Sequence, residues 1–81
     1  MRVFPNPTSG LVRVEFPMPT AGTAEVRVLS LTGAQLSWTK GQFNAGTSTL
    51  DLDLRGLASG IYLLEVQTED SIGVQRVVIE R

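Results

Sequence analysis

The sequence predicts an all-β fold, a seven-stranded antiparallel β-sandwich of immunoglobulin-like type. Three observations support this class. No stretch shows a sustained helical period with capping residues, short segments carry the apolar patterns of strands, and turn residues separate these segments at fairly regular spacing. Because strands joined by short turns usually pair, we expect the last strand to lie against the strand that contains Tyr62.

The size of the chain limits it to one core. Its 81 residues are 42% hydrophobic, and a chain this short buries roughly 60% of its unfolded surface. No apolar run approaches the ~20 residues that span a bilayer, and the start of the chain lacks the apolar segment of a signal peptide. We therefore expect a single domain over residues 1–81, with no transmembrane segment, and interpret it as a fragment of a larger protein.

Residue composition excludes several classes of function. The chain contains no cysteine and no histidine, so it lacks a disulfide framework, a thiolate metal site and the commonest general base. A serine nucleophile would have to rely on Lys40, the one lysine, or on a carboxylate. Basic residues are scattered at a net charge of -1, which gives no electrostatic footprint for nucleic acid. We expect no catalytic site, no cofactor and no nucleic-acid partner.

Acidic side chains in the second half of the chain are the remaining candidates for chemistry. Asp51 and Asp53 share one strand face and could form a carboxylate pair, to which Glu69 and Asp70 could add calcium ligands. The sequence lacks the dense run of oxygen ligands found in calcium loops, and nothing withdraws these carboxylates from water. We interpret them as solvated surface residues and expect no metal site.

Four predicted strands occupy the first half of the chain. Arg2–Asn6 is expected to form a short edge strand that runs into a turn, because Phe4 and Asn6 each precede a proline, which pushes them toward extended backbone. Leu11–Phe16 alternates cleanly, Ala24–Val28 forms the third strand, and Ala34–Trp38 is a weaker fourth. The alternation slips before Thr32-Gly33, which predicts a β-bulge or a change of sheet beside a glycine turn.

Three further strands follow a connection over Lys40–Gly46. Within this connection, Phe43 is expected to fold back over an open end of the sandwich. Thr49–Leu54 alternates most sharply, Ile61–Thr68 is apolar on both faces in its first half, and Val74–Arg81 ends the chain. The strand that begins at residue 61 therefore has the pattern of a strand paired on both sides.

A turn containing two glycines precedes this most apolar strand. Gly60 stands where a tight turn entering a strand often requires a positive φ, which glycine adopts at no steric cost. Tyr62 follows two residues later, at the place where sandwiches bury a tyrosine ring and bond its hydroxyl to backbone a few residues upstream. We expect Leu57, Gly60 and Tyr62 to form such a corner.

Four stretches of this sequence, taken together, carry a family resemblance. They are an opening stretch at Val3–Gly10, a middle one at Val26–Gly33, and a closing pair at Leu57–Val66 and Gln75–Ile79. In this order and spacing they resemble the motifs of the C-terminal sorting domains carried by cargo of the type IX secretion system in Bacteroidetes. The resemblance covers practically the whole chain, and the ordered set is more specific than any single piece.

Two features depart from the family's pattern. Arg76 stands where the family usually shows lysine, and the ending Glu80-Arg81 is longer and more acidic than the family's usual ending. These departures bear on the identity of the last recognition residues.

The resemblance implies a non-catalytic address label. Members of the family fold as small immunoglobulin-like sandwiches at the C-terminus of a larger exported protein, behind N-terminal cargo domains. They engage an outer-membrane translocon and its shuttle proteins from the periplasmic side, and a cell-surface sortase commonly removes them. The implied location is the periplasm in transit, followed by the cell surface or the medium, where the cargo is released or joined to an anionic lipopolysaccharide.

Carried over residue by residue, the resemblance also implies a set of translocon-recognition residues. The set comprises Pro5, Asn6, Pro7, Gly10, Gly33, Leu57, Gly60, Tyr62, Arg76, Val77, Val78 and Ile79. An exposed terminal strand is expected to offer unpaired backbone groups to a receptor by strand addition or side-chain docking, while the glycine turns hold it in place.

A binding module is the alternative from a different class, namely a fibronectin-like or carbohydrate-binding β-sandwich appended to a secreted hydrolase. The fold alone does not separate the two functions. A glycan or partner surface requires exposed aromatic side chains on one sheet face. The alternative therefore predicts that Trp38 and Phe43 are solvent-exposed together.

Overall fold

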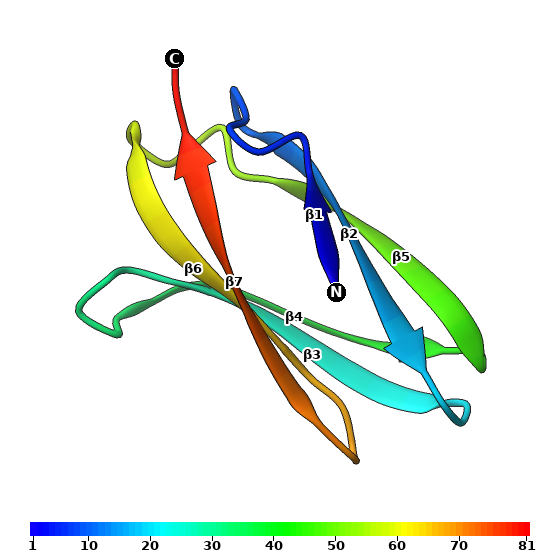
Figure 1. Cartoon of the computed structure of the whole chain (residues 1–81). Coiled ribbons are helices and arrows are strands. Elements are labelled where there is room, and N and C mark those ends of the chain that lie inside the picture. Colours follow the sequence, from blue (N-terminus) through cyan, green and yellow to red (C-terminus); the bar gives the residue numbers. More distant parts are fainter.

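The computed structural model describes every residue from Met1 to Arg81 and contains seven strands and no helix. The strands form a three-stranded sheet in the order β1-β2-β5 and a four-stranded sheet in the order β4-β3-β6-β7, both antiparallel (Figure 1). The strands are β1 (Arg2–Phe4), β2 (Leu11–Met18), β3 (Gly22–Leu29), β4 (Gln35–Phe43), β5 (Gly46–Asp53), β6 (Gly60–Gln67) and β7 (Ile72–Ile79). The predicted all-β class with seven strands is confirmed.

Alternate side chains of both sheets point inward and form one apolar core. Val14 of β2, Leu64 of β6 and Val77 of β7 are fully buried, as the period-two pattern of their strands requires. The whole cluster is Val3, Val12, Val14, Phe16, Met18, Ala24, Val26, Val28, Leu52, Leu54, Leu64, Val66, Val77 and Ile79. Charged residues such as Arg13 and Arg27 lie on the outer faces of the sheets, so the predicted alternation is confirmed.

The fourth strand is longer than the sequence suggests. The interpretation of Lys40–Gly46 as a connection is wrong at both of its ends. β4 continues to Phe43, which lies opposite Gly22 of β3, and β5 begins at Gly46. Pairing with the full length of β3 overrides the weak strand propensity of this polar segment. Phe43 does cover the core as expected, because its ring packs edge-on against Phe16 at 5.1 Å between centroids.

The turn between β3 and β4 has the predicted irregularity. The register of β3 against β4 shifts between Val28 and Leu29, which confirms the expected bulge. Gly33 has a φ of 91°, and its N–H donates to the Ser30 carbonyl at 2.9 Å. Glycine is therefore required here by backbone conformation.

Gly60 does not have the predicted positive φ, so that expectation is wrong. The glycines with positive φ are Gly10, Gly33 and Gly46. The physical reason is that Gly60 is already the first residue of β6, paired with Ile79 of β7, and its backbone is extended. The turn therefore ends before Gly60, and the chain is already in strand conformation at this residue.

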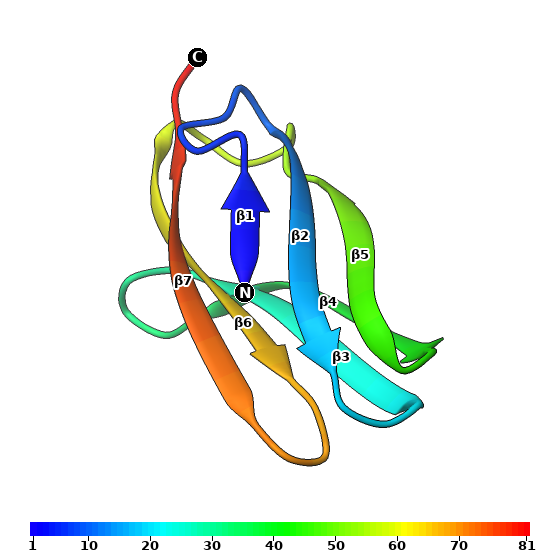
Figure 2. The same cartoon turned by 45° about the vertical axis from the view of Figure 1, so that its right-hand side comes forward.

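The segment that follows β1 meets the end of the last strand at one end of the sandwich. β7 pairs antiparallel with β6 from Gly60 opposite Ile79 to Gln67 opposite Ile72, which confirms the predicted partner of the last strand. β1 belongs to the other sheet, and the segment that follows it passes beside the end of β7 before β2 begins (Figure 2). The opening and terminal segments of the sequence are thereby neighbours in space.

Candidate functional site

The segment Asn6–Thr8, which we call the β7 cap, is hydrogen-bonded to the outer edge of β7. The Asn6 side chain donates from Nδ2 to the Arg76 carbonyl at 2.8 Å and accepts at Oδ1 from the Val78 N–H at 3.0 Å. The Thr8 N–H donates to the Val78 carbonyl at 2.9 Å, and the Glu80 N–H donates to the Thr8 carbonyl at 2.8 Å. Residues from opposite ends of the sequence thus form one hydrogen-bonded unit.

The expectation that the terminal strand offers unpaired backbone groups is wrong for three groups in the second half of β7. Its outward carbonyl at Arg76 and both outward groups at Val78 are bonded to the β7 cap. The physical reason is that an asparagine amide carries one carbonyl and one N–H₂ group, so the Asn6 side chain replaces the peptide group of a neighbouring strand. The cap makes no hydrogen bond to Ile72 or Val74, which lie in the first half of β7.

Thr8 and Gly10 connect the β7 cap to the rest of the sandwich. The buried Thr8 hydroxyl donates to the Leu11 carbonyl at 2.7 Å and accepts from the Gly10 N–H at 3.0 Å. Gly10 has a φ of 140°, and a Cβ added there would lie 2.6 Å from Cγ of Arg55. The Gly10 carbonyl also accepts from the Leu54 N–H at 2.7 Å. The chain therefore needs glycine here both for conformation and for close approach.

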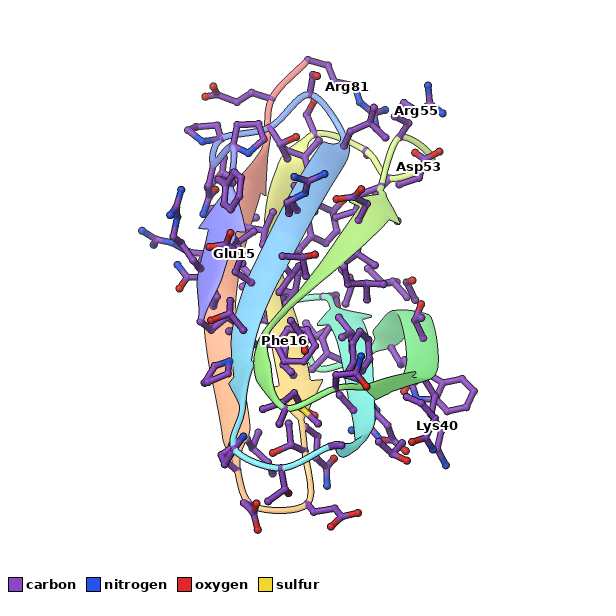
Figure 3. The ribbon with its side chains drawn as sticks, turned by 90° about the vertical axis from the view of Figure 1, so that its right-hand side faces the viewer. Glu15, Phe16, Lys40, Asp53, Arg55 and Arg81 are labelled. Atoms are coloured by element: carbon purple, nitrogen blue, oxygen red, sulfur yellow. The ribbon has the colours of Figure 1, made fainter.

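Arg81 ties the end of the chain to two turns. Its Nη2 donates to the carbonyls of Leu54, at 3.1 Å, and of Arg55, and its Nε donates to the Ser9 carbonyl at 3.3 Å. Figure 3 shows Arg81, Arg55 and Asp53 gathered at this end of the molecule. Neither Thr8 nor Arg81 is in the predicted set. A threonine two residues before a glycine is a turn signal that identifies Thr8, whereas no local pattern identifies Arg81.

A tyrosine corner forms the opposite side of the same end. The Tyr62 hydroxyl donates to the Ala58 carbonyl at 2.6 Å, and Tyr62 and Leu57 both pack against the core. A Cβ added to Gly60 would lie 3.7 Å from the Tyr62 ring, so the ring covers this glycine. The predicted corner of Leu57, Gly60 and Tyr62 is confirmed, and it corresponds to the hydroxyl-to-backbone contact known from sandwich folds.

The remaining predicted residues divide between the core, the surface and a distant loop. Val77 and Ile79 are buried, with exposed fractions of 0% and 1%, so their side chains support the fold. Arg76 and Val78 point to the outer face of the four-stranded sheet. Gly33 lies in the β3–β4 loop, which projects away from the β7 cap (Figure 1). Their part in recognition stays a prediction.

Two exposed ion pairs lie on and beside the outer face of the three-stranded sheet. Arg13 donates from Nε to Asp51 at 2.8 Å, and this hydrogen bond lowers the pKa of the Asp51 carboxyl. The Arg55 side chain and then its backbone N–H lower the pKa of Asp53 from 3.8 to about 2. Both carboxylates are ionised at neutral pH and bonded to arginine, which is the state of solvated surface groups rather than of a general acid.

The Asp53→Asn variant is expected to lose less stability than the natural protein when the pH falls from 4 to 2. A carboxyl whose folded-state pKa is lowered stabilises the fold above its ordinary pKa of 3.8, and this contribution disappears as the pH falls toward about 2. Thermal unfolding midpoints across this range test the difference. Asp70→Asn, which removes a carboxylate outside any ion pair, is the control, and equal pH slopes for the two variants would contradict the prediction.

The aromatic side chains do not form a common platform. Trp38 is 51% exposed on the outer face of β4, whereas Phe43 points to the inner side of the same strand and packs against Phe16. The two rings are therefore not exposed together, and the prediction made by the carbohydrate-binding alternative is wrong. No group of three or more Asp or Glu side chains lies close enough to hold a metal ion.

Fold and site together define a small all-β module whose opening and terminal segments form one hydrogen-bonded surface. The family model of the secretion system C-terminal sorting domain matches residues 2–80, and the chain belongs to this family. A comparison with curated proteins finds none that matches it. Sorting domains of type IX secretion are a non-catalytic type of domain that interacts with the secretion machinery, and they imply export to the cell surface or into the medium. The structure contains no helix with the length and apolar character needed to cross a membrane.

Proposed function

We propose that this domain directs a covalently attached cargo protein across the outer membrane through the type IX secretion machinery. The observation that carries the proposal is the family match over residues 2–80. In this proposal the domain has no catalytic role, travels through the periplasm as the tail of its precursor, binds the outer-membrane translocon and its shuttle proteins, and is removed by a cell-surface sortase. The sandwich itself is of immunoglobulin-like type, which its sheet order and its tyrosine corner support.

The surface read by the machinery is proposed to be the end of the sandwich that carries the β7 cap. Support comes from the hydrogen bonds that join Asn6 to β7 and from the corner at Tyr62, which place the opening and closing motifs side by side. Asn6 acts here as a positioning residue, because both polar atoms of its amide are already bonded to β7. Val77 and Ile79 act from the core, by fixing the strand that carries Arg76 and Val78.

A reporter fusion tests this function. Residues 2–81 are placed behind a periplasmically exported reporter in a bacterium that has the type IX system, and the reporter is expected on the cell surface or in the medium. A wild-type fusion that remains in the periplasm would contradict the proposal. Deleting residues 77–81 is a poor control, because it removes the two buried residues Val77 and Ile79 along with the outward ones.

The matched pair Asn6→Asp and Asn44→Asp separates the cap from general surface charge. Asn6→Asp replaces the donor to the Arg76 carbonyl by a carboxylate oxygen and opens the cap, so export of the reporter is expected to fall several-fold. Asn44 is exposed and its side chain has no hydrogen-bond partner, so Asn44→Asp is expected to export normally. An equal loss in both variants would exclude a role for the cap.

A further inference from the structure

Arg76 is the one basic side chain of the domain that has no partner. Of the seven lysines and arginines, five lie within 4.0 Å of a carboxylate, namely Arg2, Arg13, Arg27, Lys40 and Arg55. Arg81 donates to backbone carbonyls instead. The Arg76 guanidinium makes neither kind of contact. It differs in this from the other six basic side chains, each of which has a carboxylate or a backbone carbonyl as its partner.

Apolar side chains surround Arg76 on the outer face of β6 and β7. Val74 and Val78 flank it on its own strand, Leu63 lies opposite it on β6, and Ile61 lies opposite Val78. Val74 is 56% exposed and Ile61 is 43% exposed. We call these five residues the Arg76 face. Exposed apolar side chains that gather around one polar group are typical of interaction surfaces rather than of solvated faces.

The only acidic residue on the same two strands is already bound. Glu65 lies opposite Val74, but its carboxylate accepts from Nη1 of Arg27 at 2.9 Å, and Arg27 is further held by Glu25 at 2.8 Å. Glu65 therefore leaves the Arg76 guanidinium without a counter-charge. The backbone under Arg76 is also fixed, because its carbonyl accepts from Asn6 of the β7 cap. An unpaired guanidinium thus projects from an apolar surface on a strand whose backbone is held in place.

We propose that the Arg76 face docks a partner protein that presents a carboxylate within an apolar surface. This inference rests on the proposed function and names the chemistry of the partner at that surface. A guanidinium and a carboxylate form two parallel hydrogen bonds, and arginine is enriched among the residues that dominate binding energy when neighbouring side chains exclude water. A protein satisfies both features of the face, whereas an anionic lipid headgroup would leave Ile61, Leu63, Val74 and Val78 against a charged, hydrated surface.

Binding of the 81-residue domain to purified, detergent-solubilised type IX outer-membrane translocon tests the proposal. Arg76→Gln is expected to raise Kd roughly tenfold and Arg76→Glu roughly a hundredfold. Arg76→Lys should weaken binding less than Arg76→Gln, because lysine keeps the positive charge but cannot form the two parallel hydrogen bonds of a guanidinium. Arg13→Gln, an exposed arginine on the other sheet, is the control and should bind as the natural domain does. Unchanged thermal midpoints for all four variants show that the exposed substitutions leave the fold intact.

The outcomes separate this inference from the proposed function. If the natural domain binds and Arg76→Glu binds equally well, the inference is overturned and the secretion function stands. If the natural domain neither binds the translocon nor exports the reporter, both are overturned. A third measurement uses vesicles that contain phosphatidylglycerol. Binding to these vesicles that depends on Arg76, without binding to the translocon, would replace the protein partner by a lipid surface and overturn the proposal.

Discussion

Ile79→Ala is expected to destabilise the domain by about 2 to 5 kcal/mol. The Ile79 side chain is 1% exposed and lies in the core formed by both sheets, so truncation removes apolar contacts and leaves a cavity. An overall unfolding free energy of roughly 5 to 15 kcal/mol is usual for a domain, so a large share of the stability would be lost. Chemical denaturation followed by circular dichroism measures the change.

Ile72→Ala is the matched control, because it makes the same substitution at the other end of the same strand. Ile72 is 61% exposed, so its truncation is expected to change the unfolding free energy by no more than about 0.5 kcal/mol. Equal effects of the two substitutions would contradict the inward orientation of Ile79. A secretion defect of Ile79→Ala should therefore be attributed to loss of fold and not to loss of a receptor contact.

Gly10→Ala is expected to destabilise the domain by about 2 to 5 kcal/mol through two separate effects. A residue with a side chain is strained at a φ of 140°, and the new Cβ would lie 2.6 Å from Cγ and 3.0 Å from Cα of Arg55. The Arg55 side chain can move, but its backbone follows Leu54, whose N–H is bonded to the Gly10 carbonyl. Urea unfolding of the variant measures the sum of strain and overlap.

Two other glycines separate these effects. Gly33 has a positive φ of 91° but nothing within 4 Å of an added Cβ, so Gly33→Ala should show strain alone, about 1 to 2 kcal/mol. Gly56 has open space and no positive φ, so Gly56→Ala should stay within about 0.5 kcal/mol of the natural protein. The predicted order of destabilisation is Gly10, Gly33, Gly56. A Gly10→Ala variant no less stable than Gly33→Ala would show that the overlap is relieved without cost.

The parts of the fold that depend on local pattern were predictable from the sequence. Strict alternation at Leu11–Phe16 and Thr49–Leu54 identifies the strands and their inward faces, because each follows from the two-residue period of a strand. The corner at Tyr62 was predictable because its contact is local: the hydroxyl bonds to a carbonyl four residues away. Lys40–Phe43 was not, because pairing with β3 decides its conformation and its own composition does not.

The candidate site was harder to predict, because its defining contacts join distant residues. The resemblance identifies Asn6 as a member of the opening motif, but no pattern in the sequence shows that its amide pairs with the edge of β7. The same holds for the guanidinium of Arg81, which bonds to three carbonyls in two other turns. The isolation of Arg76 is visible only once the pairing of every other charge is known. These contacts are known only from the three-dimensional arrangement of residues that are far apart in the sequence.

The β7 cap also joins two segments that are far apart in the sequence. Asn6 and Arg76 stand 70 positions apart, and a loop of that length must close before their hydrogen bonds form. Without β7, Leu64 and Val66 of β6 lack the neighbouring strand at one edge of their sheet. A chain that lacks β7 cannot form the hydrogen bonds of the cap, because Arg76 and Val78 supply their partners. The cap thereby makes the opening segment and the last strand depend on each other for their backbone hydrogen bonds.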